Sequence, residues 1–146
     1  MQIIKNGKIV SDRWTVIADD LIPSEGCILV NASRWLTERD VLLARDGELG
    51  IIITAENTLE IIKDDLEHFQ LIALEFTAFT DGRSFSFAQL LRNRYGYTGE
   101  LRATGHFIRD QVSFLQRMGI DSFSFDQPTD LKATLSSLNE FSVHYQ

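Results

Sequence analysis

Residues 51–76 read IIITAENTLEIIKDDLEHFQLIALEF and contain the unit from which the fold is built. A short continuous apolar run opens the stretch and another closes it, as is typical of strands buried on both faces of a sheet. Between the two runs, Asn57 and Glu60 have the spacing of a helix N-cap and its third-position carboxylate, which predicts a helix over 58–69. The stretch therefore predicts two parallel strands joined by a helix.

The same alternation recurs along most of the chain. Strands are expected at 27–30, 51–53, 71–76, 101–103 and 122–125, and helices at 35–44, 58–69, 87–95, 105–119 and 129–141. Five strand–helix units imply an α/β fold whose parallel sheet has right-handed crossovers. An open three-layer arrangement is the first expectation, because five strands are too few to close the usual eight-stranded barrel. A half-barrel completed by dimerisation is the alternative.

Two regions carry local signals for where elements begin. Residues 1–22 precede the repeating pattern, and Asn6 with Gly7 suits a two-residue hairpin turn, which predicts a small antiparallel β-ribbon. Ser86 and Gln89 have the spacing of a capping box at the start of the third predicted helix, over 87–95. The ribbon and the strand–helix units at 27–146 are expected to form one domain over the whole chain.

Composition excludes several classes of protein. The chain has a net charge of −7, which disfavours general nucleic-acid binding. No apolar run reaches the roughly 18 residues of a membrane helix, and no signal pattern opens the sequence, so a cytoplasmic protein is expected. Cys27 is the only cysteine, which excludes an internal disulfide and a cysteine-held iron–sulfur cluster.

Positive charge is concentrated in residues 81–119. This stretch holds six arginines against three acidic residues, a formal charge of about +3, while the rest of the chain must sum to about −10. Glu75 and Arg102 lie within predicted buried strands, where a lone charge would be costly. Either the two side chains pair with each other, or they line the floor of a cleft that holds an anion or a charged group of a partner.

Further candidates follow the carboxyl ends of the strands, the edge at which parallel sheets bind ligands. Asp81 and Arg83 flank a glycine after the third strand and can present a carboxylate and a guanidinium side by side, or form a solvated turn. Gly105 opens a helix whose free amides favour an anion, and Arg109 is one turn further along. The pattern matches neither the dinucleotide fingerprint nor the phosphate loop.

The histidines predict no metal site, because His68, His106 and His144 have no spacing typical of a ligand set. His106, at a predicted helix start, is the best candidate for proton transfer, although most lone histidines do no chemistry. The helix from Gly105 is apolar on two sides, which indicates deep burial or contact with another subunit.

The arginine-rich stretch also resembles a known family. The residues that carry the resemblance are Phe79-Thr80-Asp81-Gly82-Arg83, Leu90-Leu91-Arg92, Arg94-Tyr95-Gly96, Gly99-Glu100-Leu101-Arg102-Ala103, Gly105 and Arg109-Asp110-Gln111. They are similar to DUF934, a group of small bacterial proteins described as probable oxidoreductases or accessory proteins of sulfite reduction. Where this chain has His106, the family pattern often has an aspartate, so the resemblance implies no catalytic role for this histidine.

The resemblance implies a pathway, and the residues suggest a site. The leading hypothesis is an accessory protein of assimilatory sulfite reduction, which binds a small sulfur oxyanion or sulfite reductase through the region 81–111. An oxidoreductase with a nicotinamide or flavin cofactor is one alternative, although the glycine fingerprint is missing. A structural subunit that docks through the apolar helix after Gly105, on its own copy or on another chain, is the other alternative.

Overall fold

A computed structural model describes residues 2–18, 21–54, 59–76, 82–105, 111–125 and 131–136, with the side chains of Gly82 and Arg83 left out. Its strands are β1 (Gln2–Lys5), β2 (Lys8–Ser11), β3 (Trp14–Val16), β4 (Cys27–Asn31), β5 (Leu49–Ile53), β6 (Leu71–Phe76), β7 (Glu100–Gly105) and β8 (Ser122–Phe125). They form one eight-stranded sheet in the order β2-β1-β8-β7-β6-β5-β4-β3. All strands from β3 to β8 are parallel, as the sequence predicts for its five strand–helix units.

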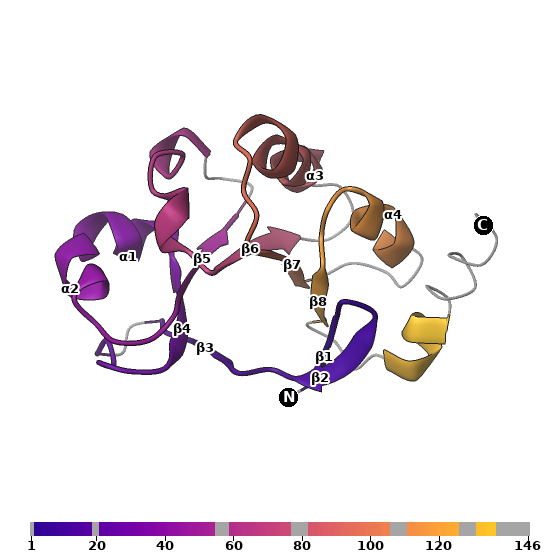
Figure 1. The fold of residues 1–146 in the computed structure, drawn as a ribbon, viewed down its shortest axis with the longest axis horizontal. Coiled ribbons are helices and arrows are strands. Elements are labelled where there is room, and N and C mark those ends of the chain that lie inside the picture. The colour runs from indigo at the N-terminus through magenta and orange to yellow at the C-terminus, as the bar shows by residue number, and fades with distance from the viewer. Residues whose placement is uncertain are drawn as a thin grey trace.

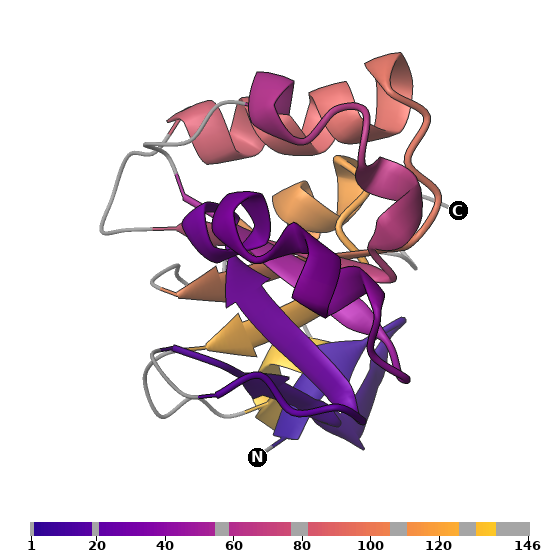
Figure 2. The same ribbon diagram turned by 90° about the vertical axis from the view of Figure 1, so that its left-hand side faces the viewer.

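The sheet is curled into a half-barrel, which confirms the half-barrel alternative and leaves dimerisation a prediction. Figure 1 shows the strands following an arc with the labelled helices on its outer side. After a quarter turn the same helices still form a layer above the strands (Figure 2). The inner side of the arc is therefore not covered by a second layer of labelled helices, in contrast to the three-layer arrangement.

The first predicted helix is observed as two short ones, α1 (Ala32–Thr37) and α2 (Arg39–Leu43). α1 begins after a side-chain cap, because the Asn31 side chain accepts a hydrogen bond from the backbone N–H of Arg34 at 2.8 Å. Trp35 is fully buried against the sheet. No helix within the described ranges is long and apolar enough to cross a membrane.

The α-helix predicted over 58–69 is wrong. In its described part the chain makes two 3₁₀ turns, η1 (Leu59–Ile61) and η2 (Leu66–His68). Between them lies Asp65, which is buried, accepts a hydrogen bond from Trp35 Nε1 at 3.0 Å and pairs with Arg39 at 2.7 Å. These contacts with the preceding helices favour a turn at Asp65 over a continuous helix, so tertiary structure overrides local preference.

The capping box at Ser86 is also wrong, because α3 (Gly82–Gln89) begins earlier and Ser86 lies inside it. Ser84 near its start donates a hydrogen bond from Oγ to the carbonyl of Glu75 at 2.9 Å. The helix continues as a π-helical turn, η3 (Leu90–Arg94), and the chain turns at Gly96, where φ is +67°.

The last predicted helices are shorter in the described residues. α4 spans Val112–Arg117, and the chain turns at Gly119, where φ is +100°, before β8. Residues 131–136 are helical and, at Leu131 and Leu135, pack on the main core.

The two faces of the sheet carry different clusters. The helix-facing side holds the main core, to which every strand from β4 to β8 contributes large apolar side chains, among them Ile28, Ile51, Ile72, Leu101 and Phe123. On the inner side, Trp14, Leu29, Leu71 and Ala73 form a smaller apolar cluster. The register places Glu100 beside Leu71 and Arg102 beside Ala73, so these charged residues share the inner face with that cluster.

The predicted N-terminal hairpin is present, with φ of 51° at Asn6 and 76° at Gly7. Its strand β1 joins the main sheet by pairing antiparallel with β8. β3 is not part of this ribbon, because it pairs parallel with β4 at the opposite edge of the sheet. The crossing segment, residues 12–13, links β2 to β3 and therefore passes across the open side of the half-barrel (Figure 1).

Candidate functional site

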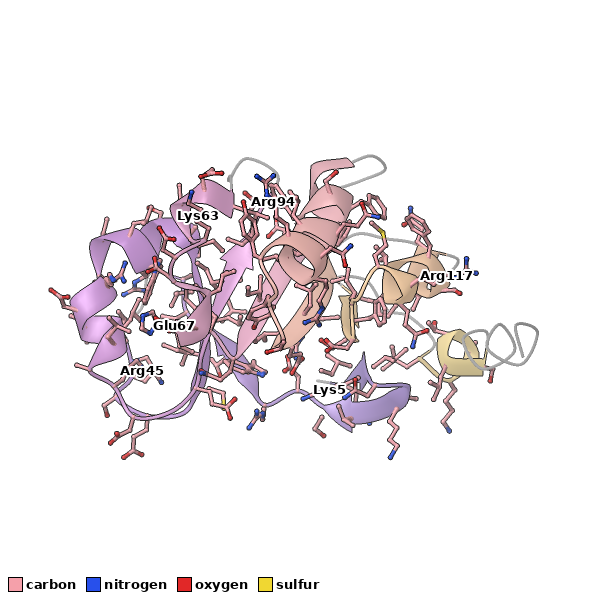
Figure 3. The ribbon with its side chains drawn as sticks, turned by 45° about the horizontal axis from the view of Figure 1, so that its top comes forward. Lys5, Arg45, Lys63, Glu67, Arg94 and Arg117 are labelled. Atoms are coloured by element: carbon pink, nitrogen blue, oxygen red, sulfur yellow. The ribbon has the colours of Figure 1, made fainter. Side chains whose placement is uncertain are left out.

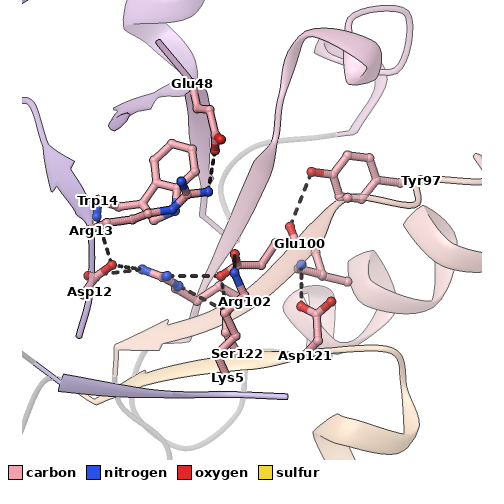
Figure 4. Close-up of polar contacts among 12 residues, drawn as sticks. Lys5, Asp12, Arg13, Trp14, Glu48, Tyr97, Glu100, Arg102, Asp121 and Ser122 are labelled. Carbon is pink, nitrogen blue, oxygen red and sulfur yellow. Dashed lines mark hydrogen bonds and ion pairs between the residues drawn. The ribbon is translucent and has the colours of Figure 1, made fainter. Parts of the chain in front are cut away.

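The crossing segment brings Asp12 against Arg102 in the middle of β7. Arg102 NH1 lies 3.2 Å from Asp12 Oδ1 and 3.3 Å from Oδ2, although the residues are 90 positions apart (Figure 4). Asp12 Oδ1 also accepts a hydrogen bond from the backbone N–H of Trp14 at 3.1 Å. Only 3% of the Arg102 side chain and 13% of the Asp12 side chain are exposed. The pair is therefore a buried ion pair on the inner face.

Three more residues complete a polar cluster around this pair. Glu100 Oε2 accepts hydrogen bonds from Arg102 NH2 at 3.1 Å and from Ser122 Oγ at 2.8 Å, and Glu100 Oε1 pairs with Lys5 Nζ at 2.9 Å. Arg102 Nε donates to Ser122 Oγ at 3.2 Å. We call Lys5, Asp12, Glu100, Arg102 and Ser122 the inner-face cluster. Its two cations and two carboxylates balance, which offsets the cost of burying each charge.

Burial and polar partners have opposite effects on the pKa values of the carboxylates in and near this cluster. Burial alone would raise the pKa of Glu100, but hydrogen bonds from Lys5 and Ser122 and the charge of Arg102 hold that pKa below its ordinary value of 4.5. At Asp121 burial wins and raises the pKa, despite a hydrogen bond from Leu101 N–H and the charge of Arg92. Burial also raises the pKa of Tyr97, whose hydroxyl donates to the carbonyl of Phe69 at 3.0 Å.

The lowered pKa of Glu100 predicts an acid-dependent loss of stability. A carboxyl whose pKa is lower in the folded protein stabilises it at pH above the unfolded value, and this contribution is lost as pH falls through the folded value. We expect Glu100→Gln to reduce the free energy of unfolding most at pH 7 and progressively less below about pH 4.5. Urea denaturation of both proteins between pH 7 and pH 3 measures this difference. The titration of Asp121 affects both proteins equally and cancels in the comparison. A difference in the free energy of unfolding that stays constant with pH would therefore contradict the prediction.

Arg92, a second arginine of the positively charged stretch, is also engaged. Arg92 donates to the carbonyls of Gly119 at 2.9 Å and of Tyr97 and Gly99 at 2.8 Å each, and it pairs with Asp121 at 3.2 Å. These bonds tie the loop between η3 and β7 to the turn before β8. Its role is therefore structural.

Two other arginines of the stretch lie at the surface. Figure 3 shows Arg94 and Arg117 on the outside of the helical layer, at η3 and α4. Both are exposed. The four described arginine side chains of this stretch are thus divided between two that are buried or partly buried with carboxylate partners, Arg102 and Arg92, and two that are exposed on the helices.

The carboxyl ends of β4 to β8 lie along one edge of the sheet, where β6 and β7 are neighbours. Phe76 at the end of β6 pairs with Gly105 at the end of β7. A Cβ at Gly105 would lie 2.5 Å from the Phe76 carbonyl oxygen, and φ there is +101°, so this close approach requires glycine. β6 and β7 therefore end side by side.

The candidates on these segments are not all placed. Asp81, His106 and Arg109 lie outside the described residues, as does the side chain of Arg83, whose backbone is in the first turn of α3. Glu75 is on the inner face, one residue before the end of β6 and opposite Thr104. No residue among those described forms an ion pair with Glu75, and the carboxylate partners of Arg102 are Asp12 and Glu100 instead.

The opposite edge of the sheet has a shallow hollow of about 490 Å³. Its lining residues are Leu66, Glu67, Phe69, Gln70, Tyr95, Gly96, Tyr97, Thr98 and Gly99. Because the lining contains a carboxylate and no basic side chain, the hollow is unsuited to an anion. Within the part of the chain that the structure describes, no group of three or more histidine, cysteine, aspartate or glutamate residues could hold a metal ion.

Sequence reasoning missed Lys5, Asp12 and Ser122 as partners in the inner-face cluster. Arg102 itself is detectable, because a charged residue interrupts an apolar strand. The other members of the cluster come from three strands and a connecting segment, and no local pattern marks them.

Comparison with known proteins agrees with the resemblance of the arginine-rich stretch. The family described as "Bacterial protein of unknown function (DUF934)" matches residues 50–146, well over half of the chain. The chain belongs to the DUF934 family. No curated protein and no solved structure matches it. Lys5 and Asp12 lie before the matched residues, so the DUF934 region completes its inner-face cluster with side chains from outside the match.

Proposed function

We propose that this DUF934 protein is an accessory protein of assimilatory sulfite reduction that binds a small sulfur oxyanion, or the reductase itself, at the carboxyl edge of β6 and β7. The pathway rests on the sequence resemblance. The location rests on the pairing of Phe76 with Gly105, because it starts two candidate-bearing segments at adjacent points. In parallel sheets this edge is where ligands bind.

Within this proposal, Arg83 and Arg109 supply positive charge, and the backbone after Gly105 supplies N–H donors. Glu75 and Asp81 are carboxylates close to the same strand ends in the chain and would orient the arginines or a cationic group of the partner. Arg102 is left out of this edge site, since its guanidinium is bonded to Asp12, Glu100 and Ser122.

Arg83→Ala is expected to weaken the binding of sulfite or sulfate by about tenfold, because a charge-assisted hydrogen bond contributes about 1.5–3 kcal/mol. Isothermal titration of the wild type and the variant with each anion, at constant ionic strength, measures the change. Binding of sulfite reductase to the immobilised wild type and to the immobilised variant tests whether the reductase is the partner.

Arg94→Ala is the matched control, because Arg94 is an exposed arginine of the same stretch at the far end of the helix that Arg83 begins. It should leave both affinities unchanged. Wild-type protein that binds neither anion and captures no reductase would refute the proposal, and equal losses in the two variants would refute the site.

A second candidate, an interaction subunit, is favoured by one observation. Phe114 on α4 is 52% exposed and continues a row of aromatic contacts from Phe76 through Phe85. Light scattering of Phe114→Ser against the wild type addresses self-association. The oxidoreductase alternative stays a prediction that an absorption spectrum and a titration with reduced nicotinamide would test.

A further inference from the structure

The contacts of Asp12 have the form of a bound oxyanion. Its two carboxylate oxygens face one guanidinium nitrogen of Arg102, and one of them also accepts the backbone N–H of Trp14. A guanidinium on a rigid central strand together with a backbone N–H is a common way to hold a free carboxylate or another small oxyanion. Here the occupant belongs to the chain itself.

Charge balance indicates that this position needs an anion. Without Asp12, Arg102 and Lys5 would face Glu100 alone, leaving one positive charge in excess at a guanidinium whose side chain is 3% exposed. An uncompensated buried charge is strongly unfavourable. An external anion at the same place would restore the balance.

One hydrogen-bond donor in this region is unused. Trp14, the residue whose backbone N–H binds Asp12, is 7% exposed, and its indole Nε1 has no acceptor among the residues that the structure describes. Buried donors are nearly always satisfied. A tetrahedral oxyanion such as sulfate has more accepting oxygens than the Asp12 carboxylate.

We propose that Arg102 and the backbone N–H of Trp14 form an oxyanion site that Asp12 occupies in the closed protein, and that a small carboxylate or inorganic oxyanion binds there when the crossing segment moves aside. The anchors of the segment are compatible with this movement. Apart from Asp12, the described contact that holds it is the pair Arg13–Glu48, whose side chains are 58% and 37% exposed. β3, which follows it, pairs through three residues at the edge of the sheet.

Asp12→Ala tests the site directly by removing the internal occupant. We expect acetate or sulfate to raise the melting temperature of this variant in a saturable manner, with an affinity at least about tenfold tighter than for the wild type, because the tethered carboxylate no longer competes. Titrations at constant ionic strength, with chloride as the balancing ion, separate binding from general salt effects. A response to acetate alone would define a planar site, and a response to sulfate alone a tetrahedral one.

Two control variants make the test specific. Asp12→Asn keeps the space filled without the charge, so it should show no gain in affinity. Asp12→Ala combined with Arg102→Met should lose the gain, because the guanidinium is gone. If Asp12→Ala does not fold, Asp12→Ser keeps an acceptor for the Trp14 N–H and leaves room for the anion. No saturable response to either anion in the folded variant, or an equal response in the double variant, would overturn the proposal.

Hydrogen exchange of the wild type tests the movement. Saturating anion should speed exchange of the β3 amides that follow Trp14, since the crossing segment must leave Arg102 before the anion binds, whereas the Trp14 N–H, which then donates to the anion, should not exchange faster. Unchanged exchange of these amides at saturating anion would refute the proposed movement of the crossing segment. This site is separate from the edge site of the proposed function, because Arg83→Ala should leave the response of Asp12→Ala intact, and either proposal can fail alone.

Discussion

Replacing Arg102 with methionine is expected to lower the free energy of unfolding by about 3–5 kcal/mol, because removal of one partner from a buried ion cluster leaves the others uncompensated. Methionine preserves most of the side-chain volume, so the loss reports charge and hydrogen bonding and not a cavity. Arg102 bonds Asp12, Glu100 and Ser122, and it lies in the central part of the sheet. Urea denaturation at pH 7, followed by circular dichroism, measures the change.

Arg94→Met is the control for this experiment. Arg94 belongs to the same stretch but is exposed, so its replacement should change the free energy of unfolding by less than about 0.5 kcal/mol. Neutralising the two carboxylates as well, with Asp12→Asn and Glu100→Gln in the Arg102→Met background, should recover part of the loss. An Arg102→Met protein as stable as Arg94→Met would mean that the cluster contributes nothing to stability.

Gly105→Ala is expected to be the second most damaging substitution. Backbone strain at a φ of +101° costs about 1–3 kcal/mol for a residue with a Cβ, and the new methyl group would also lie 2.5 Å from the Phe76 carbonyl oxygen. Relief of that contact requires β6 and β7 to separate at the carboxyl edge. Both the free energy of unfolding, measured by urea denaturation, and anion binding by the edge site should therefore be reduced.

Gly96→Ala separates the two causes. Gly96 also has a positive φ, +67°, but a Cβ there would meet nothing within 4 Å. It should therefore show the cost of backbone strain, about 1–2 kcal/mol, without the cost of a steric clash. Equal losses at the two glycines would show that the approach of Phe76 to Gly105 is relaxed in solution.

The strands of this fold are predictable because burial on both faces leaves a local mark. The runs LIALEF and SFSF coincide with β6 and β8 residue for residue. The helices are less predictable. The cap signal at Asn57 and Glu60 indicates a long helix, but contacts of Asp65 with Trp35 and Arg39 favour separate turns, and these partners are about 30 positions away.

For the candidate site, the sequence predicts which strands end together and which buried strand carries a charge, but not the partners of that charge. Alternation of strands and helices is enough to place the segments after β6 and β7 at one edge, since parallel strands end together. A charge within a buried strand was enough to single out Arg102. The identity of its partner was not, because Asp12 reaches it only through the curl of the sheet and the path of the crossing segment.

The pairing of β1 with β8 links the two ends of the described chain in a way that bears on its biogenesis. Ile4 lies opposite Phe123, so during synthesis β1 has no neighbour in the sheet, other than its hairpin partner, until β8 has been made. Contacts between positions so distant in sequence form slowly, because a long loop must close first. The N-terminal hairpin should therefore dock late, and until then it and the edge of β8 remain open to chaperones and to unwanted strand pairing.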